Sequence, residues 1–117
     1  MKTLNKYLWK NMDNKSRKIS RRQWEKGLPV DAFTWNLDGF FANIISEYLE
    51  HYLEKASKVI VITEEERQDY LYIIDFFKKY KDGFFELPRT KEEEEEFLEK
   101  HNKAFDLLKK RFRGMWW

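Results

Sequence analysis

The chain has no cysteine and few residues that break helices, with four glycines and two prolines among 117 residues. Without cysteine, neither disulfides nor thiolate-bound metals can hold the fold together, which is typical of a reducing compartment. Long apolar runs are also missing, since the longest purely aliphatic one, residues 59–62, is far too short to cross a bilayer. Lysines interrupt every apolar stretch near the N-terminus, so no secretory signal is expected. These absences predict a soluble, intracellular protein.

Aromatic residues, by contrast, are abundant. The chain has 5 Trp, 6 Tyr and 10 Phe, and its length suits one domain with a modest core. Each ring brings a large apolar area, and Trp and Tyr add a polar atom that suits an interface. The rings either fill the core of a small helical protein or contact a ligand or a second subunit. Because symmetric pairing covers exposed rings, this density of rings predicts a homodimer.

Charge is unevenly distributed, although its sum is only +2. Residues 1–30 hold nine Lys or Arg against two acids, residues 31–102 hold nine against eighteen, and residues 103–117 hold five against one. The sequence therefore predicts an acidic body with two basic ends. The run of five acids at residues 92–96 is interpreted as a solvated first helical turn, where the helix dipole favours negative charge. The alternative is an acidic surface that docks on another molecule.

Apolar residues recur at helical spacing in three long segments, residues 37–56, 64–82 and 91–113. Asn36 is a suitable N-cap for the first, and a Thr followed by a Glu three residues later predicts capping boxes at Thr63 and Thr90. The stripe of the first segment is wide enough to pack against two neighbours.

Two shorter helices are expected over residues 2–12 and over residues 16–26, the latter opened by Ser16 and closed by Gly27. Residues 59–62 are expected to form an apolar linker under the bundle. The predicted fold is all-α, a small and mostly antiparallel helical bundle with a basic N-terminal helix. One domain spans residues 1–117, with a basic segment at residues 1–30 and a three-helix core at residues 36–117.

The basic helix is the candidate ligand site. Cations at four-residue spacing share a face of a helix, and an indole beside them supplies a surface on which a base can stack. Guanidinium and ammonium groups bind phosphate, so the pattern predicts an anionic nucleotide, a nucleic acid or an acidic protein surface as ligand. The alternative is a basic helix that docks on the acidic body of the chain itself. The residues expected to bind are Arg17, Lys18, Arg21, Arg22, Trp24 and Lys26.

An enzymatic alternative rests on four carboxylates, those of Glu47, Glu50, Glu66 and Asp69. Their spacing has the outline of the helical nucleotide pyrophosphohydrolase pattern, in which carboxylates of facing helices hold Mg²⁺. In a segment with eighteen acids such pairs also arise by chance, and Glu66 is needed for a capping box. The chain has no glycine-rich phosphate loop and no nucleophile elbow. We therefore predict no metal, no cofactor and no catalytic residues.

The tryptophans at the two ends of the helical core are interpreted as structural. Trp35 and Trp116 are expected to be largely buried, packing the ends of the chain together, and Asp38 is expected to meet Arg21 or Arg111. Because an exposed pair of rings is costly, the alternative for Trp116 and Trp117 is an interface with another subunit or a target.

These end segments also resemble a family of small bacteriophage proteins. That family carries an Arg-x-Trp-x-x-Gly segment, here residues 22–27, then Trp-Asn-Leu-Asp with an Ala four residues on, here residues 35–42. It closes on an aliphatic and aromatic helix, for which this chain has residues 104–117. The resemblance implies a phage origin, a location in the host cytoplasm and no catalytic residues. Small phage proteins commonly serve counter-defence or host takeover, either by sequestering an anionic nucleotide-type ligand or by docking on a host protein as an inhibitor.

Overall fold

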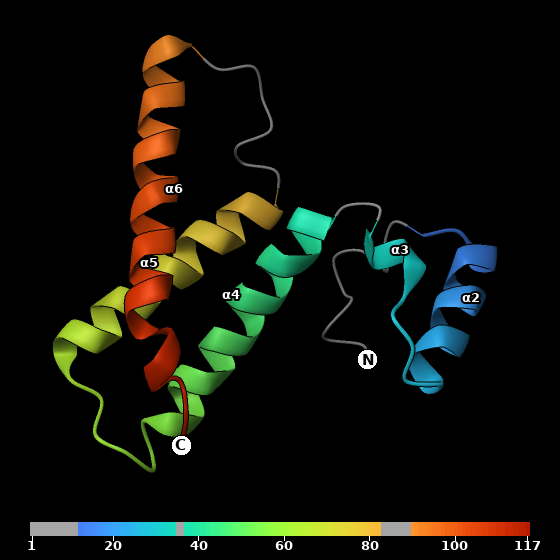
Figure 1. The fold of residues 1–117 in the computed structure, drawn as a ribbon, viewed down its shortest axis with the longest axis horizontal. Coiled ribbons are helices and arrows are strands. Elements are labelled where there is room, and N and C mark those ends of the chain that lie inside the picture. The colour runs from blue at the N-terminus through green and yellow to red at the C-terminus, as the bar shows by residue number, and fades with distance from the viewer. Residues whose placement is uncertain (1–11, 35–36, 83–89) are drawn as a thin grey trace.

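The computed structural model describes residues 12–34, 37–82 and 90–117, and these residues form helices without any strand (Figure 1). The prediction of an all-α protein is therefore confirmed, whereas the helix expected over residues 2–12 lies outside the described residues. The elements in chain order are α2 (Asn14–Glu25), α3 (Asp31–Thr34), α4 (Leu37–Ala56), α5 (Glu64–Lys81), α6 (Lys91–Arg111) and a 3₁₀ turn, η1 (Phe112–Gly114).

The three long helices form where the apolar periodicity and the caps predict them. Thr63 accepts a hydrogen bond from the Glu66 N–H at 3.2 Å, and the Glu66 carboxylate accepts one from the Thr63 N–H, which completes the capping box of α5. Thr90 caps α6 by accepting from the Glu93 N–H at 3.2 Å, which forms one half of the capping box predicted there, without the reciprocal bond seen in α5. The last helix ends at Arg111, two residues earlier than predicted, because the chain tightens into the 3₁₀ turn there.

The core lies on α5, which packs against α4 on one side and α6 on the other. Ile73 and Tyr70 of α5 are fully buried, and Ala42 and Ala104 on the neighbouring helices are small enough to let the backbones approach. The chain direction reverses from α4 to α5, which lie nearly antiparallel, whereas α6 crosses α5 at a wide angle (Figure 1). Ala104 is the single residue of α6 that is buried, and the first turns of this helix project beyond the other two (Figure 1).

A smaller apolar cluster joins the N-terminal helices to the core. Val30, Ala32 and Phe33 are buried in it, and the Phe33 ring stacks on Phe40 of α4 with 4.6 Å between ring centroids. The short helix α3 was not expected. Its first residue, Asp31, is held by Gln23 of α2, whose side-chain amide donates to the Asp31 carboxylate and accepts from the Asp31 N–H, both at 2.9 Å.

The start of α2 and the position of residues 59–62 differ from the sequence prediction. The basic helix begins at Asn14, because the Asp13 carboxylate accepts from the Ser16 N–H at 2.7 Å and so takes the N-cap position expected for Ser16. It closes as expected at Gly27, which adopts a φ of 71° that favours glycine. Residues 59–62 connect α4 to α5 as expected, but only part of the segment contacts the bundle: Ile62 packs against the core, whereas Val59 and Val61 are 62% and 91% exposed.

Candidate functional site

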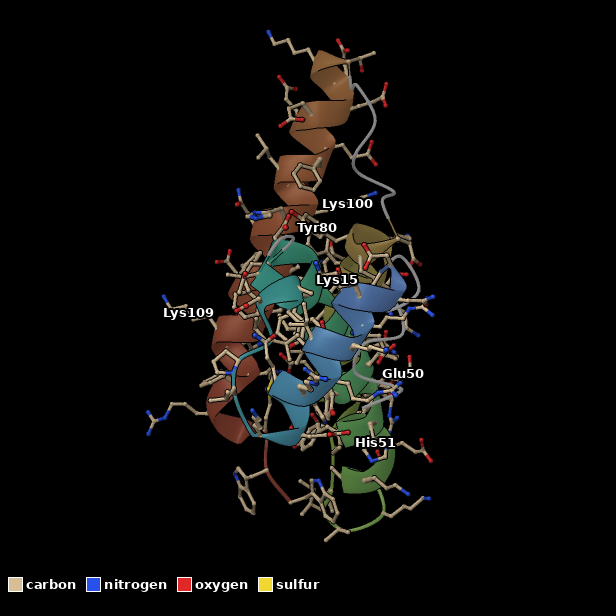
Figure 2. All side chains as sticks on the ribbon, turned by 90° about the vertical axis from the view of Figure 1, so that its right-hand side faces the viewer. Lys15, Glu50, His51, Tyr80, Lys100 and Lys109 are labelled. Atoms are coloured by element: carbon tan, nitrogen blue, oxygen red, sulfur yellow. The ribbon has the colours of Figure 1, made fainter. Side chains whose placement is uncertain are left out.

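The outward side of α2 carries a group of cations that we call the basic face. At 3.6 residues per turn, Lys18 and Arg22 lie almost in line, and Lys15 and Lys26 flank them. All four are exposed, whereas Ser20, on another side of the helix, is buried. Figure 2 looks onto this side of the molecule and shows α2 in front, with Lys15 labelled. Arg21 is exposed beside this group, and Arg17 is half-buried.

The carboxylates nearest to the basic face in sequence serve the backbone of the same segment. Asp13 caps α2, and the hydrogen bond from the Ser16 N–H holds the pKa of its carboxyl below the ordinary value of 3.8. Asp31 is bound by Gln23. Within α2 itself Glu25 is the one acid against five cations, at residues 15, 17, 18, 21 and 22. Cations therefore outnumber acids along α2, which gives the basic face a positive potential.

Trp24 lies apart from Lys18 and Arg22, although it shares its side of α2 with Arg17 and lies next to Arg21. It follows Arg22 by two residues, about 200° around the helix, so the two side chains leave opposite sides. Its ring meets Phe33 edge-on, with 6.5 Å between centroids, and the residue is 36% exposed. Trp24 thus belongs to the contact between α2 and α3.

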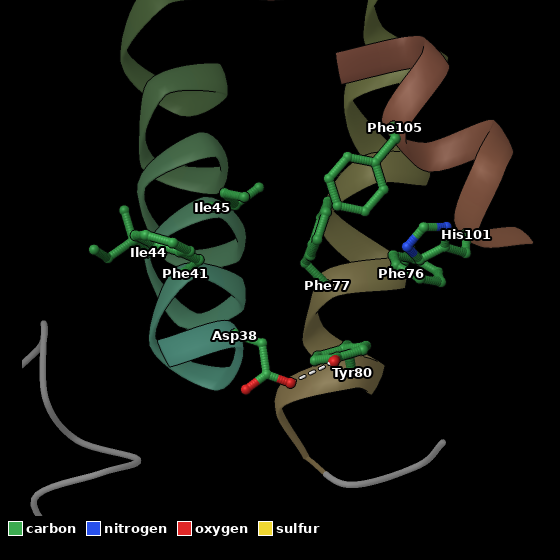
Figure 3. A pocket seen from close by; sticks show the side chains of 9 residues that line it. All are labelled: Asp38, Phe41, Ile44, Ile45, Phe76, Phe77, Tyr80, His101 and Phe105. Carbon is green, nitrogen blue, oxygen red and sulfur yellow. Dashed lines mark hydrogen bonds between the residues drawn. The ribbon is translucent and has the colours of Figure 1, made fainter. Parts of the chain in front are cut away.

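A second feature is an apolar groove between α4 and α6 (Figure 3). The sequence predicted apolar stripes on these helices but no groove between them. The volume of the groove is about 340 Å³, within the range of sites that receive a small ligand or a partner's side chain. Phe76 and Phe77 of α5 lie between the two walls, and most of the lining is aromatic or aliphatic. The lining residues are Asp38, Phe41, Ile44, Ile45, Phe76, Phe77, Tyr80, His101 and Phe105.

The polar groups of the groove lie near one end of α4 and on α6. The Tyr80 hydroxyl donates to the Asp38 carboxylate, and this hydrogen bond lowers the pKa of the Asp38 carboxyl, with further help from the N–H groups of the first turn of α4 (Figure 3). The expectation that Asp38 meets Arg21 or Arg111 is therefore wrong. His101 packs among rings, 4.7 Å from Phe105 and 6.1 Å from Phe76 between centroids, as a half-buried boundary residue.

Arg111 instead joins the end of α6 to the start of α5. Its Nε and Nη2 lie 2.9 and 2.8 Å from Oδ2 of Asp69, and Lys110 lies 3.4 Å from the same oxygen. Burial of Asp69 raises the pKa of its carboxyl, but the hydrogen bonds from Arg111 and Lys110 outweigh burial and leave the pKa below its ordinary value. The hydrogen bond to Glu65 at 3.1 Å, followed by that to Asp69, raises the pKa of Lys110. Burial lowers the pKa of Arg111, but the contacts with Asp69 outweigh burial and raise it.

The four carboxylates of the enzymatic alternative are not gathered into one site. Glu47 faces Lys81 at 3.4 Å, Glu50 pairs with Lys78, Glu66 closes the capping box and Asp69 binds Arg111. Across the described residues no three acidic, histidine or cysteine side chains are grouped so that they hold a metal ion. The geometry gives the pyrophosphohydrolase alternative no support.

The C-terminal tail is attached through its backbone, with its rings outside. The Tyr52 hydroxyl bonds to the carbonyl oxygens of Gly114 and Trp116, at 3.1 and 3.2 Å. Met115 reaches the core, but Trp116 is 67% exposed and Trp117 is also exposed. The prediction that Trp116 is buried is wrong, because the 3₁₀ turn carries the tail away from α5. Trp35 lies outside the described residues.

Comparison with known proteins adds no assignment. No protein-family model, curated protein or solved structure matches the chain. Among the described residues, no helix is both long enough and apolar enough to span a bilayer. The two features that define a candidate site are therefore the basic face of α2 and the groove between α4 and α6.

Proposed function

We propose that the protein is a non-enzymatic binding protein that captures a phosphate-bearing, nucleotide-type anion on the basic face of α2. One observation carries this proposal: Lys15, Lys18, Arg22 and Lys26 are all exposed along one side of a single capped helix. Cations fixed on a rigid helix bind phosphates with little loss of backbone entropy, and Arg adds paired hydrogen bonds.

The resemblance to small bacteriophage proteins supports a phage origin and action in the host cytoplasm. In that setting the ligand is a signalling nucleotide or a strand of nucleic acid, and its sequestration serves counter-defence or host takeover. The proposal includes no ring stacking by Trp24, because that ring is engaged with Phe33.

Salt dependence distinguishes the two kinds of ligand. Neutralising about four phosphates of a single strand gives a slope of roughly −3 in a plot of log K against log salt. A nucleotide that meets two cations gives a slope about half as steep. Fluorescence titration of a labelled single-stranded oligonucleotide and of a panel of linear and cyclic nucleotides, from 20 to 200 mM salt, measures both.

The test compares two variants with equal changes of charge. Lys18→Glu with Arg22→Glu reverses two exposed cations of the basic face and should lower affinity at least tenfold. Lys58→Glu with Lys109→Glu reverses two exposed cations outside it and should change affinity less than threefold. Equal losses in both variants, or no binding to any of these anions at low salt, would refute the proposal.

A second function, docking on a host protein as an inhibitor, is favoured by one specific observation. Trp116 and Trp117 present exposed rings at the end of a tail that Tyr52 fixes in place. Exposed Trp residues are common anchors of protein interfaces. If the protein impairs host growth on expression, the inhibitor function predicts that Trp116→Ala with Trp117→Ala abolishes the effect. The reversal of Lys18 and Arg22 should then leave it intact, and the anion-binding function predicts the opposite pattern.

A further inference from the structure

We infer that the outer surface of α4 and α6, with the groove between them, binds a second copy of this chain. This inference concerns a surface distinct from the basic face and does not depend on the anion-binding function. We call this surface the α4–α6 face. It is defined by Leu37, Phe41, Ile44 and Tyr48 on α4, by Leu98 and Phe105 on α6 with Phe112 of the 3₁₀ turn η1, and by the groove.

The α4–α6 face is apolar along both helices. Leu37, Phe41, Ile44 and Tyr48 follow one another at helical spacings of four, three and four residues, and so form one row on α4. Leu98 and Phe105 are seven residues apart on α6, and Phe112, seven residues further on in η1, extends this second row. The more exposed members are Leu37, Phe41, Tyr48, Leu98, Phe105 and Phe112, at 42%, 53%, 53%, 46%, 44% and 69%.

The exposed area of these rows is at the upper end of the patch size of a monomer and approaches that of a protein interface. If a fully exposed large apolar side chain presents ~200 Å², the six residues leave on the order of 600 Å² uncovered. The largest apolar patch of a typical monomer is about 300–600 Å², and a standard interface buries about 800 Å² on each partner. The face with its groove and rim thus supplies roughly what a stable dimer needs.

The shape of the α4–α6 face suits contact with itself. A two-fold dimer requires a surface that carries both a projection and the recess that receives it. Here the row of partly exposed rings on α4 lies directly beside the groove, so each copy can offer Phe41 or Tyr48 to the groove of the other. The lining favours this occupant, because Asp38 is its one ionised carboxylate and is bonded to Tyr80. An anion or a highly charged partner would find few complementary groups there, whereas interfaces between identical subunits are commonly apolar.

Sedimentation velocity over 1–100 μM protein tests the inference. The wild type should sediment as two 14.6 kDa chains at the upper concentrations and dissociate on dilution. Phe41→Glu on α4 and Phe105→Glu on α6 should each weaken dimerisation at least tenfold. Both side chains are half-exposed in the single chain, so the variants should keep the helical circular dichroism spectrum.

Val61→Glu is the matched control, since Val61 is apolar and 91% exposed but lies in the loop before α5. This variant should dimerise like the wild type. A wild type that remains monomeric at 100 μM would overturn the inference and leave the face to a different partner. So would a Phe41→Glu variant that keeps its helical spectrum and dimerises with unchanged affinity. Anion binding measured on the same variants is a separate readout, so failure of either proposal is recognised by itself.

Discussion

The ion pair between Asp69 and Arg111 should be worth more to the stability of the fold than an ordinary surface pair. The Asp69 and Arg111 side chains are 15% and 18% exposed. Two guanidinium nitrogens of Arg111, Nε and Nη2, lie within 2.9 Å of one carboxylate oxygen of Asp69, Oδ2. Exposed pairs contribute about 0.2–1 kcal/mol, whereas breaking a fully buried pair costs about 3–5 kcal/mol. For this intermediate burial we expect a coupling free energy of roughly 1–3 kcal/mol.

A double-mutant cycle with Asp69→Asn and Arg111→Met isolates that coupling. Met keeps most of the apolar stem of Arg, so the cycle removes the charge with little change in packing. Because Lys110 also contacts Asp69, the single mutants contain other terms, and only the cycle reports the pair itself. Urea unfolding followed by circular dichroism gives the four free energies. The pair of Glu96 and Lys100, exposed on α6 at 64% and 44%, is the control and should couple by about 0.3–0.5 kcal/mol.

The coupling should also depend on pH. The pKa of the Asp69 carboxyl lies below its ordinary 3.8 in the folded chain, so folding favours the ionised form. The stabilisation is therefore complete above pH 3.8 and is lost as the pH falls through the lower, folded value. The coupling should be smaller near pH 2.5 than at pH 7. A coupling at pH 7 no larger than that of the control pair, or one unchanged at pH 2.5, would refute this reasoning.

Three further predictions concern the core and the tail. Burial, helped by Tyr52, raises the pKa of Tyr70 to about 12, so the fold should lose about 2–3 kcal/mol as the pH rises from 10 to 12. Tyr70→Phe should remove that loss in urea titrations, and an unchanged loss would contradict it. Ile73→Ala should lower the free energy of unfolding by about 2–5 kcal/mol because the residue is fully buried. Leu71→Ala, on the exposed side of the same helix, should lower it by less than about 1 kcal/mol. Equal losses in the two variants would refute this description of the core. Trp116→Ala should cost less than about 0.5 kcal/mol, and a loss above about 2 kcal/mol would place the ring inside the fold.

The three long helices could be predicted from sequence because each has a clear apolar period, with which a second signal, the cap, agrees for α5 and α6. The cap expected for α4, Asn36, lies outside the described residues. Apolar spacing defines the inner face, and Thr63 and Thr90 mark where α5 and α6 begin. The short helix α3 lacked such signals. Four residues give no period, and its start depends on the side chain of Gln23 from another helix.

Periodicity also does not tell how many neighbours an apolar face meets. The stripe of α4 is wide enough for two partners, but α5 covers Leu49 and Leu53 while Phe41 and Tyr48 remain half-exposed. The groove could therefore be recognised only from the arrangement of the helices in space. The same limit applies to the basic face, where the cations were predicted but the turning of Trp24 toward Phe33 was not.

The first turn of α4 and the end of α6 fix the two ends of α5, the central helix. Asp38 from the first turn of α4 bonds to Tyr80 in the last turn of α5, and Arg111 from the end of α6 bonds to Asp69 near the start of α5. Each contact joins residues about forty positions apart, so each fixes where one helix lies along another. The charge and hydrogen-bonding capacity of these residues are constrained by defined partners, although the sequence alone predicted neither pair. A binding surface built from several exchangeable lysines, or from exposed rings, imposes no such requirement on any one position, which is why function in this chain has to be sought on its surfaces.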